Sequence, residues 1–433
     1  MNYKIYIAET IKYILRSPFF IRKELKEVER LYNMTDNERM EYENQAFLRT
    51  FRTAIRKSPF YKKLYSDAGI KESDIQSIKD LGKLPIITKG QIRNCSEQLL
   101  TRSKKGLKIS HTSGTTGEPL IIYDNWKVHK YYRAYNYTYY KKLGFNFGKD
   151  RHVSIRGFLQ KNDIKLKLHI SNTLFLSSYN IRNETAKLYY SEIKRYAPKA
   201  ISGYPNSLYN LALLFKELNL KLKIPLCFTS SETLYDHQRF LISDVFGCEI
   251  FDIYGNSEHA CTLYESINHD GYFKAPGSGY FEFDSKGIIA TSFINEAWPL
   301  IRYQMNDIIQ PNESENVYSF NQPVSVKSLY GRTSECITLN DGTKLGAAGI
   351  SFIFKHSNNI KIAQFIQHED RTVDINIVPD KNFSEQDIKN IKKPIYERLG
   401  FNDNEFKINL IKPEQIIYSH RNKYSMIISK YKK

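Results

Sequence analysis

The stretch that decides the fold is His111-Thr-Ser-Gly-Thr-Thr-Gly-Glu-Pro119, a loop rich in glycine and hydroxyl side chains. It lies between two apolar segments that we expect to be strands, Leu107–Ile109 and Leu120–Tyr123. Glycines let a backbone approach a phosphate closely, and free N–H groups and hydroxyls can hold its oxygens. The loop lacks the Lys of the G-x-x-x-x-G-K-[ST] motif of P-loop NTPases. The pattern therefore predicts a phosphate-binding loop of another type, with an ordinary Ser/Thr/Gly hairpin loop as the alternative.

Helical and strand-like segments alternate after this loop, which favours an α/β fold. Residues 1–70 have mostly helical spacing. The expected helices beyond the loop are one that ends at Tyr196 before Pro198, Leu208–Leu218, and Thr233–Phe246 with Thr233 as its N-cap. The expected strands are Ile224–Thr229, Glu249–Tyr254 and a hairpin over Tyr280–Phe293.

The last hundred or so residues form a separate β-β-α-β pattern. Its expected elements are strands Ile360–Gln367 and Thr372–Val378, a helix that starts from a Ser384/Asp387 capping box and ends at Gly400, and a strand over Phe406–Ile411. We therefore predict a large N-terminal domain over residues 1–331, with a helical part over 1–105, and a small α+β domain over 332–433.

Composition limits the class of protein. The chain has 433 residues, of which 64 are Lys or Arg and 46 are Asp or Glu, so its formal net charge is +18. A hydrophobic fraction of 41% argues against a disordered chain. The charge indicates either an anionic partner, such as nucleic acid, phosphates or a membrane surface, or a general bias towards Lys, Ile, Asn and Tyr.

The cysteines and the apolar segments indicate the cellular compartment in which we expect the protein. The five cysteines are widely spaced without a C-x-x-C pair, so neither a disulfide framework nor a cysteine zinc site is expected. Charges interrupt every apolar run of residues 1–23, which is not typical of a signal peptide. No stretch approaches the ~18 apolar residues of a membrane-spanning helix. We expect a cytoplasmic protein with reduced thiols.

Three further segments carry groups suited to nucleotide chemistry. Tyr254-Gly-Asn-Ser-Glu258 follows an expected strand, where its ring could stack on a base and Glu258 could hold Mg²⁺; a tight turn with a surface Glu is the alternative. Asp307 could hold ribose hydroxyls and Arg332 a phosphate, or both could form structural ion pairs. The tail Ser419–Lys433 has five basic residues and no acid, which predicts either a catalytic Lys or a solvated end.

Taken in order, these segments resemble the motifs of the adenylate-forming enzymes, and most closely the branch of phenylacetate–CoA ligases and CapK-like proteins of capsular polysaccharide gene clusters. The matches are Thr112–Pro119 with the phosphate loop SSGTTGxP, Tyr254–Glu258 with YGxTE, Arg302–Asp307 with RYxxxD, Gly331–Glu335 with GRxxD, and Asn422-Lys423 with a terminal GK. Ser58-Pro-Phe-Tyr-Lys62 and Leu84-Pro-Ile-Ile-Thr-Lys89 also look like that branch. The resemblance covers almost the whole chain.

The resemblance implies ATP and Mg²⁺ as ligands and a role for each matching residue. The implied ATP-binding residues are Ser113, Gly114, Thr115, Thr116, Gly117, Ser231, Glu232, Tyr254, Gly255, Asn256, Ser257, Asp307 and Arg332. The implied catalytic residues are Thr115, Glu258 and Lys423, and Glu258 is also the implied Mg²⁺ ligand. The expected acid-binding residues are Arg156, Tyr204, Ser230 and His259.

The chain departs from the family pattern at three places. Ser334 stands at the hinge where an acid is usual, and Asn422 stands where a Gly precedes the family's Lys. Some relatives carry a Cys and a His after the Glu motif, but only His269 is present in the comparable stretch, so no zinc is expected. In the family, the small C-terminal domain rotates about the hinge between two half-reactions.

The resemblance implies an ATP-dependent ligase that converts a small carboxylic acid into an acyl-AMP and then transfers the acyl group to a thiol, such as that of CoA, or to a sugar amine. It points to surface polysaccharide biosynthesis, with no nucleic acid as partner. The surplus positive charge leaves contact with the inner membrane face open. The alternatives are a basic membrane- or nucleic-acid-associated protein with a degenerate nucleotide-binding fold, and an acyl-protein synthetase.

Overall fold

The computed structural model describes residues 3–111, 120–156, 164–284, 287–305, 307–311, 326–332, 336–340, 344–346, 350–354, 359–418 and 424–431. The chain divides into two compact units. The first comprises residues 1–234, 238–305 and 311–328, and the second comprises 235–237, 306–310 and 329–433. The described residues confirm the predicted mixed α/β architecture, whereas the predicted domain boundary at 331/332 stays a prediction.

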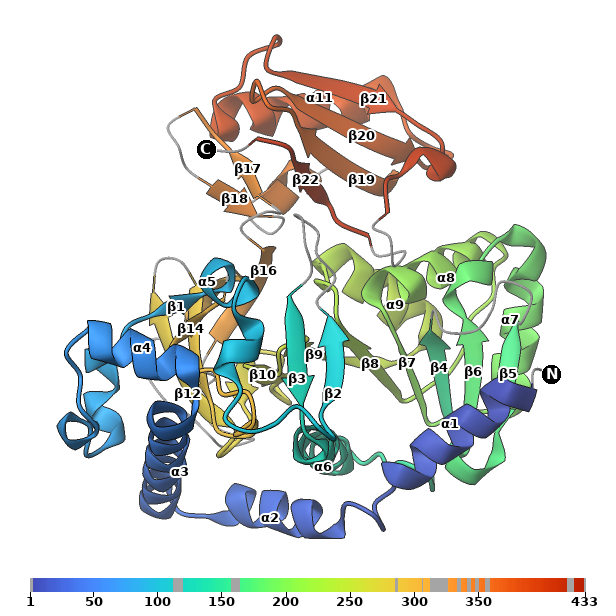
Figure 1. Cartoon of the computed structure of the whole chain (residues 1–433). Coiled ribbons are helices and arrows are strands. Elements are labelled where there is room, and N and C mark those ends of the chain that lie inside the picture. The colour runs from blue at the N-terminus through green and yellow to red at the C-terminus, as the bar shows by residue number, and fades with distance from the viewer. Residues whose placement is uncertain are drawn as a thin grey trace. The chain divides into compact units, whose positions relative to one another are not determined.

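Helices dominate the start of the chain, as expected (Figure 1). They are α1 (Tyr3–Leu15), α2 (Arg22–Asn33), α3 (Asp36–Lys57), α4 (Pro59–Asp67) and α5 (Lys89–Arg93). Helix α3 begins at a capping box in which Thr35 and Glu38 bond each other's backbone N–H groups. It ends at Ser58, and Pro59 opens α4 because proline fits the first turn of a helix but not its interior. Among the described residues, no helix has both the length and the apolar character to cross a membrane.

A sheet of ten strands among the described residues has the order β15-β16-β11-β10-β9-β8-β7-β4-β6-β5. Its strands are β4 (His152–Arg156), β5 (Lys165–Leu168), β6 (Thr173–Ser177), β7 (Ala200–Gly203), β8 (Leu226–Ser230), β9 (Glu249–Gly255), β10 (Thr262–Glu265), β11 (Tyr272–Lys274), β15 (Asp307–Pro311) and β16 (Val326–Arg332). The connecting helices are α7 (Asn183–Tyr196), α8 (Pro205–Glu217) and α9 (Asp236–Phe246). Strands β4, β6, β7, β8 and β9 are parallel, so their buried apolar runs read without alternation.

Helix α6 (Trp126–Lys142) supplies the aromatic core against this sheet. Its Tyr139 is fully buried, and the ring centroids of Tyr139 and Tyr264 of β10 lie 4.6 Å apart. Helix α2 packs against α6. Buried tyrosines of α6 are therefore packing residues whose hydroxyls bond backbone oxygens, as Tyr139 does with Glu265 at 2.8 Å and Tyr135 with Pro276 at 2.7 Å.

Two smaller sheets complete the first unit. One has the order β1-β14-β13-β12, with β1 (Ile87–Thr88), β12 (Gly279–Asp284), β13 (Gly287–Ser292) and β14 (Tyr303–Gln304). The other pairs β2 (Lys108–His111) with β3 (Ile121–Asp124), the two strands predicted around the hydroxyl-rich loop. The predicted hairpin over Tyr280–Phe293 is confirmed as β12 and β13.

The second unit confirms the predicted β-β-α-β pattern. Its sheet has the order β21-β20-β19-β22, with β19 (Ile360–Gln367), β20 (Val373–Pro379), β21 (Phe406–Leu410) and β22 (Ile427–Ser429). The Ser384/Asp387 capping box starts α11 (Glu385–Pro394), and the helical segment ends at Gly400 with φ +68°. Strands β17 (Cys336–Thr338) and β18 (Lys344–Gly346) pair with each other as a short antiparallel ribbon.

One predicted helix start is wrong. Helix α9 begins at Asp236, three residues after Thr233, so Thr233 is not its N-cap. The chain before the helix is irregular, with Ser231 in a left-handed conformation at φ 74°. Asp236 then places a carboxylate in the first turn, where the helix dipole favours it.

Candidate functional site

Several predicted site residues lie at the carboxyl ends of four parallel strands, β4, β7, β8 and β9, at one edge of the large sheet. From β4 the chain passes to β6 on one side and later to β7 on the other, which makes the β4–β7 junction a switch point. Ligands of open α/β sheets bind outside such a point. Arg156 ends β4 and Tyr204 follows β7, so both lie at this junction. Ser230 ends β8, and Tyr254 and Gly255 end β9, farther along the same edge.

Arg156 and Tyr204 contact each other at the switch point. The guanidinium carbon of Arg156 lies 5.7 Å from the ring centroid of Tyr204, a cation–π distance. Gly203 makes the close packing there feasible, because a Cβ at this position would lie 3.0 Å from Leu208 Cγ and 3.4 Å from Ile155 Cβ. A guanidinium at this edge can bind a carboxylate or phosphate through a fork of N–H groups.

Ser231 and Glu232, both predicted to bind ATP, lie in a segment that is hydrogen-bonded to helix α8. Ser231 has φ 74°, a conformation that a non-glycine residue keeps only where its surroundings hold it. The backbone N–H of Asn206 donates to Glu232 Oε2 at 3.2 Å. Asn206 lies in the first turn of α8, where a carboxylate also interacts favourably with the helix dipole. Glu232 therefore has a structural role that the sequence did not reveal.

In the turn after β9, the side chain of Glu258 is buried. Asn256 closes the turn, because its Oδ1 accepts from the N–H of Ala260 at 2.9 Å and its carbonyl accepts from the N–H of His259 at 3.2 Å. Ser257 is exposed, whereas Glu258 is only 6% exposed. His259 has φ 52°, a second left-handed residue at this edge. The turn thus separates a solvent-facing hydroxyl from a buried carboxylate.

Glu258 pairs with a cation from a distant part of the chain. Lys89 Nζ lies 3.2 Å from Glu258 Oε1, and the hydroxyl of Tyr303 donates to the same oxygen at 3.3 Å. The pairing of β1 with β14 sets Ile87 opposite Tyr303, which places Lys89 near the carboxylate. Lys89 belongs to a segment that resembles the family, but nothing in the sequence assigned it a role.

The buried Asp124 and two partly buried histidines, His129 and His259, form a group that we call the histidine cluster. Nε2 of each His lies 3.9 Å from Asp124 Oδ2, and the two imidazole centroids lie 5.6 Å apart. Burial raises the pKa of Asp124 to about 6. Burial also lowers the pKa of His129 to about 3 and that of His259 to about 4. At neutral pH, two uncharged imidazoles therefore lie beside one carboxylate, a set that can bond a polar substrate or exchange its protons.

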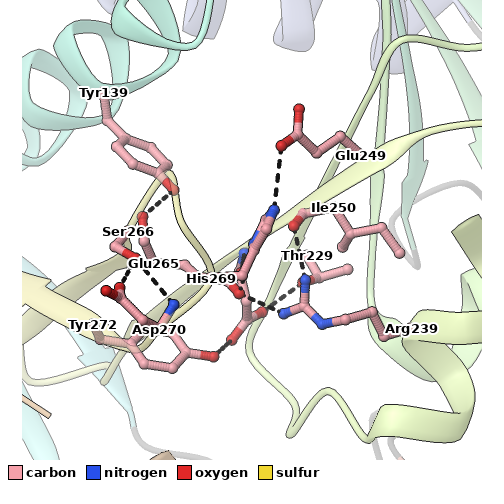
Figure 2. A network of polar contacts seen from close by, with 11 residues as sticks. Tyr139, Thr229, Arg239, Glu249, Ile250, Glu265, Ser266, His269, Asp270 and Tyr272 are labelled. Carbon is pink, nitrogen blue, oxygen red and sulfur yellow. Dashed lines mark hydrogen bonds and ion pairs between the residues drawn. The ribbon is translucent and has the colours of Figure 1, made fainter. Parts of the chain in front are cut away.

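A network of hydrogen bonds and ion pairs links the strands whose ends form this edge of the sheet, as Figure 2 shows. Thr229 Oγ1 of β8 donates to Asp252 Oδ1 of β9 at 2.6 Å, and the hydroxyl of Tyr272 of β11 donates to Oδ2 at 3.0 Å. Asp252 is buried, which raises its pKa to about 6. Thr229 directly precedes Ser230, and Asp252 lies two residues before Tyr254, so the network helps to hold the relative positions of Ser230 and Tyr254.

Glu265 of β10 is the other centre of this network. It accepts from Arg239 Nη2 at 2.7 Å and from the backbone N–H of Asp252 at 2.7 Å. His269 bonds Glu265 through Nδ1 at 3.0 Å and Glu249 through Nε2 at 3.3 Å. The hydrogen bond to Glu265 raises the pKa of His269. His269, the residue considered for zinc, is thus bonded to two carboxylates in this network.

Some predicted residues lie outside the described part of the chain, namely Ser113–Gly117, Ser334 and Lys423. Asp307 begins β15 and Arg332 ends β16, both in the second unit, and the side chain of Arg332 is outside the description. The roles assigned to all of these residues stay predictions. Among the side chains that the structure describes, no three His, Cys, Asp or Glu residues are grouped so that they could hold a metal.

Comparison with known proteins identifies relatives over most of the chain. Residues 337–430 match a family model described as the CapK C-terminal domain. A curated relative, Protein CapK of Staphylococcus aureus, is 25% identical over 386 residues, which cover 85% of this chain and 85% of the relative. The predicted resemblance to CapK-like proteins is therefore confirmed.

Solved structures confirm the fold class. A crystal structure of 2-hydroxyisobutyryl-CoA ligase in the postadenylation state superposes with a TM-score of 0.73, covers 93% of this chain and 92% of that chain, and is 15% identical. The amide bond synthetase McbA from Marinactinospora thermotolerans superposes with a TM-score of 0.50 over 74% of this chain and 68% of that chain, at 12% identity. The fold of this chain is thus that of adenylate-forming ligases, with a large N-terminal and a smaller C-terminal domain.

Proposed function

We propose that this chain, a relative of CapK with the fold of adenylate-forming ligases, is an ATP-dependent ligase that makes an acyl-AMP. The observation that carries the proposal is the sheet edge itself: Arg156 and Tyr204 at the switch point, with the Tyr254–Glu258 turn along the same row of strand ends. A guanidinium, an aromatic ring and a buried carboxylate are the groups that an acid, a nucleobase and a metal-bound phosphate need.

The chemistry explains this choice of groups. A carboxylate acylates poorly because oxide is a bad leaving group. In the proposed reaction, a carboxylate oxygen attacks the α-phosphorus of ATP, the bond to the β-phosphate oxygen breaks, and pyrophosphate leaves. The residues mainly position two anions and offset charge that develops at phosphorus. We assign the phosphates to Ser113–Gly117 with Thr115, adenine to Tyr254, ribose to Asp307, and charge stabilisation to Lys423 and Arg332.

Glu258 fits a Mg²⁺ ion that accompanies the nucleotide. Mg²⁺ is commonly held by one or two carboxylates and completed by substrate phosphates and water. Lys89 and Tyr303 both bond Glu258 through Oε1, which leaves Oε2 as the proposed metal ligand. Such an ion would neutralise charge on the phosphates. Lys89 and Tyr303 meanwhile keep the carboxylate oriented.

The acid would lie between the switch point and the histidine cluster. Arg156 would pair with a charged or polar group of the acid, and Tyr204, Ser230 and His259 would line its site. The histidine cluster makes this region polar, because both of its imidazoles face a buried carboxyl group. We therefore favour an acid with additional hydroxyl or carboxyl groups over a purely hydrocarbon acid.

The acyl group would then pass to a thiol or to a sugar amine. Among the structural neighbours, one is a CoA ligase and another an amide bond synthetase, so the fold accommodates both acceptors. The resemblance of the motifs to those of CapK-like proteins of capsular polysaccharide gene clusters favours a role in surface polysaccharide biosynthesis, and we propose that the protein acts in the cytoplasm. We assign residues 1–331 to binding of ATP and acid, and 332–433 to a lid that turns about Ser334.

Exchange of labelled pyrophosphate into ATP tests the proposal directly. We expect one acid or a few related polar acids from a broad panel to drive exchange in the presence of Mg²⁺. Lys423→Ala should abolish exchange while ATP binding persists, and Thr115→Val should weaken ATP binding. Lys412→Ala, a change at an exposed Lys of the same unit, is the matched control. No exchange with any acid, together with no ATP binding by calorimetry, would refute the proposal.

A further inference from the structure

Helix α1 presents an apolar face to solvent. Ile7, Ile11 and Leu15 lie four residues apart, on one side of the helix, and are 56%, 52% and 43% exposed. Phe19 and Phe20 follow in the next turn with 80% and 48% exposure. We call these five residues the apolar stripe. Scattered exposed apolar residues are ordinary, but an aligned set that ends in two phenylalanines marks a binding surface.

The chain that carries the end of the apolar stripe is fixed to the rest of the first unit by a hydrogen bond and by a buried side chain. The hydroxyl of Tyr137 on α6 donates to the carbonyl of Arg16 at 3.0 Å, directly after α1. Ile21, the residue after the Phe pair, is fully buried in the main core. The rings of Phe19 and Phe20 also pack edge to face with centroids 5.4 Å apart. The two phenylalanines are therefore held outward by a fixed turn.

Neighbouring segments extend the surface. Helix α1 packs against the edge strand β5 and the following 3-10 turn, His169–Ser171 (Figure 1). Ile170 of that turn is 46% exposed. Two exposed lysines lie on the same edge strand, namely Lys165, which pairs with Glu192 at 2.9 Å, and Lys167. The apolar stripe thus continues into a mixed apolar and basic rim.

The charge around the stripe is mostly positive. Residues 3–23 contain five basic side chains against a single acid, Glu9, and Glu9 is paired with Lys12 at 2.6 Å. Arg22 and Lys23, next to the Phe pair, are exposed. An apolar helical face with basic residues beside it is the composition that lies in the interface of an anionic bilayer, where each Lys or Arg strengthens binding.

We propose that α1 and the Phe19–Phe20 turn dock this protein onto an anionic phospholipid surface. The apolar stripe enters the boundary between headgroups and acyl chains, and Arg22 and Lys23 contact lipid phosphates. A second copy of the chain is a poorer occupant, because a two-fold interface would set the same basic residues against each other. The inference is independent of the proposed ligase activity and accounts for part of the net charge of +18.

Vesicle cosedimentation of the full chain tests this inference. The protein should pellet with vesicles of phosphatidylcholine plus phosphatidylglycerol and much less with phosphatidylcholine alone. Phe19→Ser/Phe20→Ser should lower the partition coefficient by roughly tenfold or more. Arg22→Glu/Lys23→Glu should lower it by at least roughly tenfold on anionic vesicles only. High salt should have the same effect as the charge reversal.

Phe240→Ser is the matched control, because Phe240 lies on α9 with 77% exposure, close to that of Phe19. It should leave vesicle binding unchanged, and thermal unfolding should show all variants folded. The inference fails if the wild-type chain does not pellet with anionic vesicles, or if the Phe240 and Phe19/Phe20 variants lose equal binding. It also fails if Phe19→Ser/Phe20→Ser only converts a dimer to a monomer in sedimentation, which would make the stripe an interface between copies.

Discussion

A buried ion pair between Lys274 and Glu43 offers a quantitative test of the packing. Lys274 of β11 and Glu43 of α3 are 2% and 3% exposed, and Lys274 Nζ lies 3.1 Å from Glu43 Oε2. Nζ also donates to the carbonyl of Gly279 at 2.9 Å, and Glu43 Oε1 accepts from the N–H of Gly277 at 3.1 Å. Burial lowers the pKa of Lys274, so only close bonding keeps this ammonium charged.

Removing one partner should cost far more than removing both. Lys274→Met leaves the Glu43 carboxylate buried without its cation, and breaking such a pair costs about 3–5 kcal/mol. At roughly 1.5 °C per kcal/mol for a unit of about 320 residues, the midpoint of thermal unfolding should fall by about 5–8 °C. Glu43→Gln/Lys274→Met should recover much of that loss, because Gln still accepts from Gly277 and no unpaired charge remains. The coupling energy should therefore be about 2 kcal/mol.

Thermal and urea unfolding of the two single variants and the double variant measure this cycle. Lys104→Met is the matched control: its pair with Glu97 has a similar separation of 2.9 Å, but the side chains are 59% and 61% exposed. That change should cost less than about 1 kcal/mol, because exposed pairs contribute little. A Lys274→Met cost equal to that of the control, or additive single costs in the double variant, would refute the reasoning.

Three further predictions concern the candidate site. The pKa of Asp124 is raised from 3.8 to about 6, so the folded state binds its proton more tightly, and this contribution to stability is present below pH 3.8 and lost as the pH rises through about 6. The wild type should thus lose about 2–3 kcal/mol of unfolding free energy between pH 4 and pH 7 that Asp124→Asn, which cannot titrate, does not lose. The same change in unfolding free energy with pH in both proteins would contradict this. Gly203→Ala should cost about 1–3 kcal/mol and raise the acid KM in pyrophosphate exchange, because its Cβ would press on α8; an unchanged KM would show that the strand end does not shape the site. Lys89→Met should lower the Mg²⁺ concentration for half-maximal exchange several-fold, because the ammonium of Lys89 beside Glu258 repels a second cation while Tyr303 still orients the carboxylate, whereas Lys104→Met should not; no difference would argue against Glu258 as the metal ligand.

Local patterns in the sequence predicted much of the fold. The hairpin of β12 and β13, the Ser384/Asp387 capping box of α11 and the strands of the second unit depend on residues within a few positions of one another. The same reasoning placed the N-cap of α9 wrongly at Thr233, since the chain before the helix is shaped by contacts with α8 rather than by its own propensity. The ordered motifs predicted the family and fold that the comparisons support.

The sequence by itself determined which segments become helices and strands and which motifs follow strand ends. Only the tertiary structure decided that Lys89 meets Glu258, that Lys274 meets Glu43, and that Arg156 lies on Tyr204. Partners so far apart in the chain are selected by how sheets and helices pack, and no local spacing encodes them. The same holds for α1: its helical pattern is local, but which of its faces stays exposed depends on what β5 and the His169–Ser171 turn cover.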